Sequence, residues 1–184
     1  MGDARAQVRE AFPAVDDIQD DGLREGVLQA WVTAMAENGI EDLAALPWLP
    51  PEQARLDLPD ERLVPHVNGV VDGALAEAEV LLAHRDDVDL SLDLLLAGAL
   101  VHDVSKCYEF DGEEETDVGR LLGHPHFGVH VAAAAGLPVE VQHVVLAHSH
   151  RTAVEPTTLE AEIVAAVDRV AARAIRMQSD AYEG

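Results

Sequence analysis

Polar residues that commonly bind metal ions interrupt apolar stripes that the sequence predicts to be helical. The pair His102–Asp103 directly follows eight apolar or glycine residues, Leu94–Val101. His66 and Asp168 lie on two further apolar stripes. Burial of an unpaired carboxylate is costly, so these groups need a cation, a metal or a dense hydrogen-bond network. Two imidazoles and two carboxylates form a suitable coordination sphere for a divalent metal ion.

Further histidines follow in two short segments of the chain. The segment GHPHFGVH contains His124, His126 and His130, and the segment HSHR contains His148 and His150. His126 and His130 are four residues apart, a spacing that places two imidazoles on one face of a helix. The remaining two histidines, which we expect at the surface, are His84 and His143.

The charge of the chain is strongly negative, and Lys106 is its only lysine. The chain has 35 acidic and 12 basic residues, which give a formal net charge of −23. This balance disfavours nucleic-acid polymers and anionic membranes as partners, because no basic stripe is present to neutralise phosphates. It fits either simple solubility through charge or adaptation to a salt-rich cytoplasm, where salt screens repulsion between carboxylates. Lys106 lies three residues after Asp103 and can pair with an acidic neighbour such as Asp103 or Glu109.

The apolar periodicity predicts an all-α protein. Aromatic residues make up only 4% of the chain, and the alternation typical of strands is almost absent. Residues Glu109–Gly119 are expected to form an acidic loop, and Gly136 is expected to end a helix. The expected helices cover Ala4–Phe12, Gly22–Glu37, Glu61–His84, Leu90–Cys107, 124–136, Val139–His148 and Thr158–Gln178.

The proline-rich segment Pro47–Pro51 divides the chain into two expected parts. A helical extension over residues 1–50 contains no catalytic cluster and is expected to serve as a packing lobe or an oligomer contact. A metal-binding catalytic domain is expected over residues 51–184. Cys107 is the only cysteine, which excludes an intrachain disulfide and suits a reducing interior. With no 18-residue apolar segment and no signal-like N-terminus, a cytoplasmic protein is expected.

The order of these groups resembles the HD-domain metal-dependent phosphohydrolase superfamily. The segment HDVSK is similar to the HD-x-[GS]-K form of that family, preceded by His66 and followed by Asp168. The segments LLGHPHFGV and VVLAHSH resemble the additional histidines of its two-metal members. The spacing is most similar to the branch that includes bacterial diadenosine-tetraphosphate hydrolases. The resemblance covers Arg62–Arg173 and implies an HD-domain-like helical bundle.

The resemblance also implies a role for each candidate site residue. Asp103 would bridge two metal ions, and Lys106 and Arg151 would contact phosphate oxygens, although Arg151 would equally fit an exposed surface position. His126 and His150 would contact the substrate or transfer protons, or would replace the histidines two residues before them as ligands. One ion would be held by His66, His102, Asp103 and Asp168, and the second by Asp103, His124 and His148.

These implied residues lead to an expected activity. The chain is expected to hydrolyse a phosphoester or phosphoanhydride of a small metabolite, such as a nucleotide, by attack of a metal-bound hydroxide. The cofactors would be two divalent ions, with Fe, Mn, Co, Ni, Mg and Zn as candidates. A phosphohydrolase with one metal ion, a di-iron oxygenase with the same ligands, and a non-catalytic binding module are the alternatives. A homo-oligomer is compatible with all of them.

Overall fold

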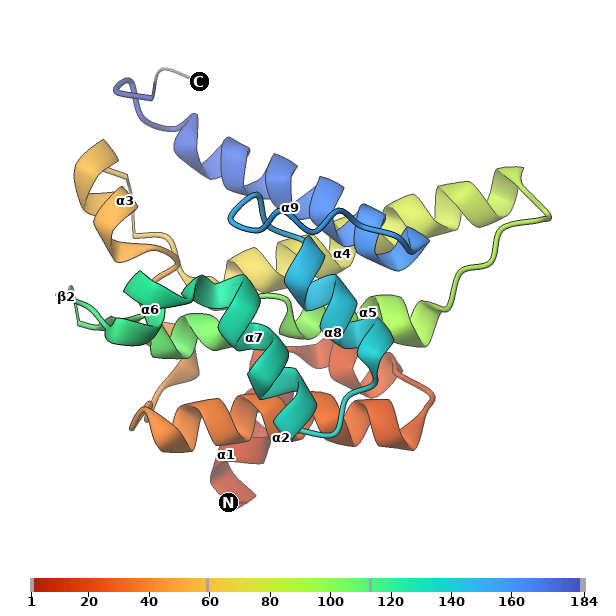
Figure 1. Cartoon of the computed structure of the whole chain (residues 1–184), viewed down its shortest axis with the longest axis horizontal. Coiled ribbons are helices and arrows are strands. Elements are labelled where there is room, and N and C mark those ends of the chain that lie inside the picture. The colour runs from red at the N-terminus through yellow and green to blue at the C-terminus, as the bar shows by residue number, and fades with distance from the viewer. Residues whose placement is uncertain (1, 59, 113, 183–184) are drawn as a thin grey trace.

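Helix α5 (Leu92–Val101) lies at the centre of a helical bundle (Figure 1). The computed structural model describes residues 2–58, 60–112 and 114–182. The Ser91 side chain caps the start of α5 by accepting a hydrogen bond from the Leu94 backbone, and the helix is buried from Leu95 to Val101. It contacts four other helices, α2 (Asp21–Glu37), α4 (Leu63–His84), α8 (Val139–Ala147) and α9 (Leu159–Arg176). The prediction of an all-α protein is therefore confirmed.

Helices α4 (Leu63–His84) and α9 (Leu159–Arg176) lie together on one side of α5 (Figure 1). Gly73 on α4 allows their close approach, because a Cβ atom there would lie 2.6 Å from Cγ1 of Val167 on α9. Gly69, one turn earlier on α4, has no such neighbour, because a Cβ atom there would meet nothing within 4 Å.

Helix α8 (Val139–Ala147) packs on another side of α5, and α7 (Gly123–Ala134) packs against α8. Gly98 lets α5 approach α8, since a Cβ atom there would lie 2.7 Å from Cγ1 of Val144. Gly136 follows the end of α7 with a φ of 80°, a left-handed conformation that favours glycine. It therefore ends this helix as predicted.

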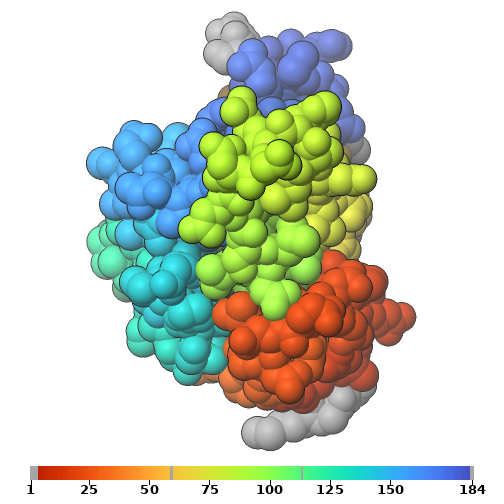
Figure 2. Space-filling model, turned by 90° about the vertical axis from the view of Figure 1, so that its right-hand side faces the viewer, coloured from red at the N-terminus to blue at the C-terminus, as the bar shows by residue number. Residues whose placement is uncertain are grey.

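The N-terminal elements pack below α5. Figure 2 shows these elements in red below the yellow-green α4–α5 region, with α9 in blue at the other end of this face. The indole N–H of Trp31 donates a hydrogen bond to the carbonyl of Leu100 at 2.9 Å. These elements are α1 (Gly2–Ala11), η1 (Pro13–Asp17), α2 (Asp21–Glu37) and η2 (Leu43–Ala45). Helix α3 (Pro50–Leu56) lies instead beside the C-terminal end of α9 (Figure 1).

The predicted helix over Leu90–Cys107 is wrong at its C-terminal end. Helix α5 ends at Val101, and the chain continues as the 3-10 helix η3 (Val104–Tyr108) after the turn at His102–Asp103. Burial continues through this break, so the apolar pattern of the sequence gives no sign of it.

Two further segments, one acidic and one rich in proline, form short elements that the sequence did not predict. The acidic segment forms a small antiparallel pair, β1 (Phe110–Asp111) and β2 (Glu114–Glu115), followed by α6 (Asp117–Leu121). The proline-rich segment leads directly into α3, because proline is well tolerated in the first turn of a helix. Across the described part of the chain, no helix has the length and apolar character needed to cross a membrane.

Candidate metal centre

Six potential metal ligands from distant parts of the sequence meet beside the end of α5. They form two groups that share Asp103, and within each group the potential ligand atoms lie within 4.8 Å of one another. Helix α4 provides one residue, the α5–η3 turn two, α7 one, the C-terminal end of α8 one and α9 one. These residues are His66, His102, Asp103, His124, His148 and Asp168.

The two carboxylate oxygens of Asp103 face different imidazoles. Oδ2 lies 3.4 Å from Nε2 of His66 and 3.5 Å from Nε2 of His102. Oδ1 lies 3.6 Å from Nε2 of both His124 and His148. Asp103 is only 2% exposed, so water cannot readily replace these neighbours. The carboxylate thus lies between two pairs of histidines.

Asp168 completes the first group from α9. Its Oδ1 atom lies 3.1 Å from Nε2 of His66 and 3.9 Å from Nε2 of His102. Atoms that each lie about 2.1 Å from one ion are separated by about 3.0 to 4.2 Å. The distances within this group therefore match those between ligands of a shared divalent ion.

Hydrogen bonds fix the ring orientation of two of the histidines. Nδ1 of His102 lies 2.7 Å from the carbonyl of Ala99, and Nδ1 of His148 lies 2.7 Å from the carbonyl of Val145. Because a carbonyl oxygen can only accept, Nδ1 carries the proton in both rings. In the neutral imidazole, Nε2 then presents its lone pair towards Asp103.

Several buried atoms of the site have no hydrogen-bond partner among the described residues. They include Nε2 of His66, Nε2 of His102 and Oδ1 of Asp103. Burial of such atoms without partners is unfavourable, and a metal ion coordinated between them would satisfy them. The residues present therefore fit a divalent metal ion.

Glu109 is a buried carboxylate behind His124 and has 0% exposure. Its Oε1 atom accepts a hydrogen bond from the backbone N–H of His124 at 2.9 Å and lies 3.4 Å from Nδ1 of the same residue. Arg151 donates to the same oxygen at 3.3 Å. From the sequence, the only role expected for Glu109 was a possible pairing with Lys106. It lies in an acidic segment, so nothing in the local sequence distinguishes it.

The surroundings of Asp103, Asp168 and His124 favour the protonation states that bind metal ions. Burial opposes ionisation of Asp103 and Asp168, but nearby cationic and imidazole groups outweigh it. The pKa of Asp168 falls to about 2, and the pKa of Asp103 is well below its ordinary value. Burial lowers the pKa of His124 to about 4, so this imidazole is neutral at pH 7.

The pKa values of His66 and His148 shift in the opposite direction to that of His124. Burial lowers the pKa of each ring, but the adjacent carboxylates of Asp103 and Asp168 together outweigh that effect and raise the pKa overall. Because a metal ion binds the neutral imidazole, metal binding competes with protonation of these two rings.

A cavity of about 380 Å³ opens over this centre. Lys106 lines it, with Nζ 3.4 Å from Oδ2 of Asp103 and 3.4 Å from the carbonyl of Trp48. The pairing of Lys106 with Asp103 that the sequence left open is therefore present. Arg151 and His150 also line the cavity, so the structure brings both to the centre.

Three further residues that line this cavity were not assigned from the sequence: Trp48, Glu52 and Arg176. The Trp48 ring centroid lies 5.2 Å from Nζ of Lys106 and 5.3 Å from the guanidinium carbon of Arg176. An aromatic residue between prolines carries no chemical signal in the sequence. Its position became apparent only from the folded chain.

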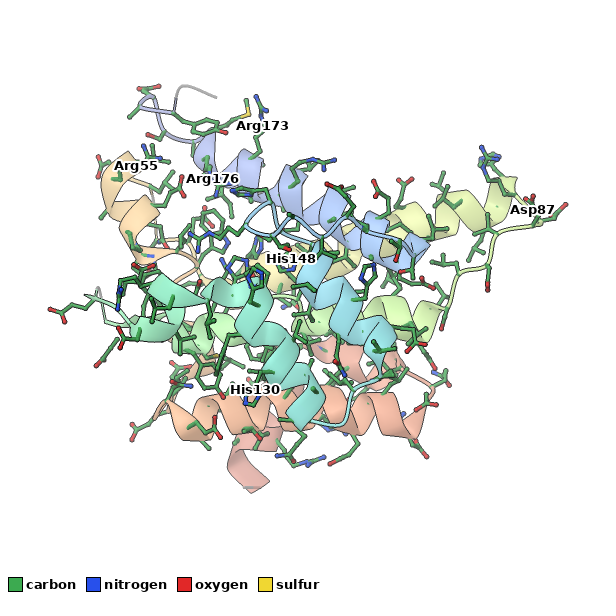
Figure 3. The ribbon with its side chains drawn as sticks, in the orientation of Figure 1. Arg55, Asp87, His130, His148, Arg173 and Arg176 are labelled. Carbon is green, nitrogen blue, oxygen red and sulfur yellow. The ribbon has the colours of Figure 1, made fainter. Side chains whose placement is uncertain are left out.

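The structure does not bring the other histidines to the cavity. His126 is exposed, with Nδ1 3.1 Å from the carbonyl of Leu122, and does not line the cavity. Figure 3 shows His130 on the α2 side of α7, away from His148. His84 is exposed, whereas His143 is partly buried and accepts a hydrogen bond from the Thr157 backbone at 2.9 Å.

The central part of the chain matches a known protein family. Residues 70–173, more than half of the sequence, match the HD domain. The chain belongs to the HD domain family. Five of the six candidate ligands lie within the matched HD domain, whereas His66 precedes it. Comparison with curated proteins and with solved structures gave no significant match.

Proposed function

We propose that this chain is a metal-dependent phosphohydrolase that uses two divalent ions to cleave a phosphoester or phosphoanhydride of a small metabolite. The observation that carries the proposal is the position of Asp103, whose two oxygens face separate pairs of imidazoles. Membership of the HD domain family supports hydrolysis as the reaction class. The similarity of the motif spacing to bacterial diadenosine-tetraphosphate hydrolases favours a nucleotide substrate.

The proposed ligands divide between the two ions. The first ion would be held by His66, His102, Asp103 and Asp168, and the second by Asp103, His124 and His148. This mixture of nitrogen and oxygen donors suits Mn, Fe, Co, Ni or Zn, while Mg prefers oxygen donors. When bound, such a pair supplies Lewis-acid activation of a phosphoryl group and of water.

The side chains around the cavity would bind and orient the substrate. Lys106 and Arg151 provide positive charge next to Asp103 and Glu109, where they can contact phosphate oxygens. His150 is exposed at the cavity and can donate a proton to the leaving group. His126 lies outside the cavity, so we propose no substrate contact for it.

The charge of the chain favours a small substrate. A net charge of −23 repels polyanionic polymers over most of the surface. A small anion can still reach a cavity that contains metal ions and basic side chains. Nucleic-acid polymers are therefore not proposed as partners.

Elemental analysis of the purified chain is the first test, followed by a phosphate-release panel with Mn, Fe, Co, Ni and Mg at low and high salt. We expect two ions per chain, with both metal and activity lost in Asp103→Asn. His124→Ala should retain one ion, and His130→Ala, at an exposed position on the same helix, should behave as the wild type. Absence of metal, or unchanged activity in Asp103→Asn, would contradict the proposal. Oxygen consumption without phosphate release would instead favour the di-iron oxygenase.

A further inference from the structure

A second cationic group lies in the same cavity, near the C-terminal end of α9. Arg176, in the last turn of α9, lies 5.3 Å from the Trp48 ring through its guanidinium carbon. Lys106 lies 5.2 Å from the same ring and 3.4 Å from Asp103. One buried indole thus connects a cation at the proposed metal centre with a second cation farther along the cavity.

Trp48 is well suited to fix the position of both cations. It is 2% exposed, and its backbone carbonyl accepts a hydrogen bond from Lys106 at 3.4 Å. Cations near an aromatic face are attracted to it by the ring quadrupole. The indole therefore limits the movement of two flexible side chains that would otherwise sample many rotamers.

Glu52 fixes Arg176 from the other side of the cavity. Nε of Arg176 lies 3.0 Å from Oε1 of Glu52, and Nη2 lies 3.4 Å from Oε2. Arg55 donates to Oε1 of the same carboxylate at 3.0 Å. Because one carboxylate is shared between two guanidinium groups, a net positive charge remains. Within the described residues, Nη1 of Arg176 makes no hydrogen bond, so it is free to contact a ligand.

The concentration of basic residues here is unusual for this chain. Four of its twelve lysines and arginines line this one cavity, although the formal net charge is −23. Three acidic residues other than the proposed ligands also line it: Glu52, Glu155 and Glu162. The four basic residues are Lys106, Arg151, Arg169 and Arg176.

We infer that Trp48, Glu52 and Arg176 form a subsite for a second phosphate of the substrate, away from the phosphoryl group that is cleaved. The planar guanidinium of Arg176 suits recognition of phosphate oxygens, and Trp48 and Glu52 act as positioning residues for it. All three lie outside residues 70–173, so this specificity is added by segments that flank the matched HD domain. The inference rests on the proposed phosphohydrolase function.

The same contacts would also be present if the Glu52–Arg176 pair only held α3 against α9. The two roles differ in their response to Glu52→Gln. In a phosphate subsite, Glu52→Gln keeps an acceptor oxygen that holds Arg176 in position but removes the negative charge beside it, so phosphate binding becomes stronger. If the pair is only structural, the substitution lowers stability and leaves phosphate binding unchanged.

The test measures binding of inorganic tripolyphosphate and inorganic phosphate to the metal-loaded chain, in excess Mg²⁺ so that the probes do not remove bound ions. Calorimetry and tryptophan fluorescence report binding without turnover. The wild type should prefer tripolyphosphate by about tenfold or more, as expected for an added charge-assisted hydrogen-bonded contact. Arg176→Ala should remove most of this preference, and Glu52→Gln should increase it several-fold.

Arg173→Ala is the matched control. Arg173 lies one turn earlier on α9, and Figure 3 shows it extending away from the region between α3 and α9 that Arg176 faces. Its removal should leave the preference unchanged. If Arg176→Ala does not fold, Arg176→Gln, which keeps a donor towards Glu52, is measured instead. The inference is overturned if the wild type, the Arg176 variant and Glu52→Gln all show the same preference for tripolyphosphate over phosphate.

Kinetics separate this inference from the proposed function. For a hydrolysed nucleoside triphosphate, Arg176→Ala should raise KM about tenfold with little change in kcat, and should not affect a monophosphate substrate. If no substrate releases phosphate, the proposed function fails, while the tripolyphosphate preference still tests the subsite. If Asp103-dependent release occurs but Arg176→Ala matches the wild type, only the subsite fails.

Discussion

One carboxylate oxygen of Glu109 lies 2.9 Å from the backbone nitrogen of His124 and 3.4 Å from Nδ1 of its ring. Nε2 of the same ring faces Asp103 at 3.6 Å. A carboxylate behind a histidine orients the ring and increases the basicity of the nitrogen that faces a metal. The Ser105 hydroxyl also donates to the His124 carbonyl at 2.6 Å, so hydrogen bonds fix the backbone of this residue on both sides while its ring faces the Glu109 carboxylate.

Substitution Glu109→Gln tests this orientation. The amide retains the size of the side chain but loses the negative charge that faces His124 and Arg151. We expect the affinity of the second ion to fall by about 10- to 100-fold, the range found for partners of metal-binding histidines. Titration with Mn²⁺ followed by calorimetry measures this change. Glu114→Gln, on the nearby exposed strand β2, is the control, and equal affinities in both variants would argue against the role of Glu109.

The thiol of Cys107 is expected to be chemically inert in the folded protein. Burial raises its pKa to about 12, and the residue is only 3% exposed. The thiolate is the reactive form, so very little of it is present at pH 8. Iodoacetamide should therefore label the native chain slowly and label one site per chain rapidly after denaturation, as mass spectrometry can show. Rapid labelling of the native protein would contradict this burial.

Two glycines of α4 should respond in opposite directions to alanine. In Gly73→Ala the new methyl group would lie 2.6 Å from Cγ1 of Val167, and a β-branched neighbour has few alternative rotamers. We expect a loss of about 1 to 3 kcal/mol in the free energy of unfolding from overpacking. Gly69→Ala meets nothing within 4 Å and should stabilise the helix by up to about 1 kcal/mol. Urea denaturation measures both changes, and destabilisation of equal size would contradict the α4–α9 packing.

The Glu52–Arg176 pair predicts a pH-dependent contribution to stability. Burial raises the pKa of Glu52, but the contacts with Arg176 and Arg55 together outweigh it and lower the pKa below the ordinary value. A carboxylate with a lowered pKa stabilises the fold above its unfolded pKa, and this contribution is lost as the pH falls through the folded value. We expect Glu52→Gln to cost about 1 kcal/mol at pH 7, because the pair is partly exposed.

The difference between wild type and Glu52→Gln should therefore shrink as the pH is lowered from 7 towards 3. Denaturation at a series of pH values measures it. Arg24 pairs with Asp21 at the exposed start of α2, and Asp21→Asn provides a surface-pair control with a smaller effect. A difference that stays constant over this pH range would show that Glu52 acts through packing and not through charge.

Local sequence patterns were sufficient to predict the long helices and four of the candidate metal ligands. The periodicity of α4 and α9 placed His66 and Asp168 on apolar stripes, and the apolar run of α5 ended at His102–Asp103. Burial of polar groups on such stripes indicates metal chemistry from residue type alone. The end of α5 at Val101 was not predictable in this way, because burial continues into η3.

The choice between neighbouring histidines was decided only by the tertiary structure. Residues 124 and 126 are two apart on α7, so their side chains differ in direction by about 200°. Only the rotation of α7 against the rest of the bundle determines that His124 faces Asp103 while His126 is exposed. Sequence spacing does not contain that rotation.

The sequence by itself determined an all-α chain with a histidine and carboxylate cluster on apolar helices, because residue type and helical period are local properties. The tertiary structure decided which groups surround that cluster. Glu109 reaches His124 across 15 positions of the chain, and Trp48 reaches Lys106 across 58. Contacts over such separations depend on how whole helices pack, and helix packing is set by the complete core and not by any single segment.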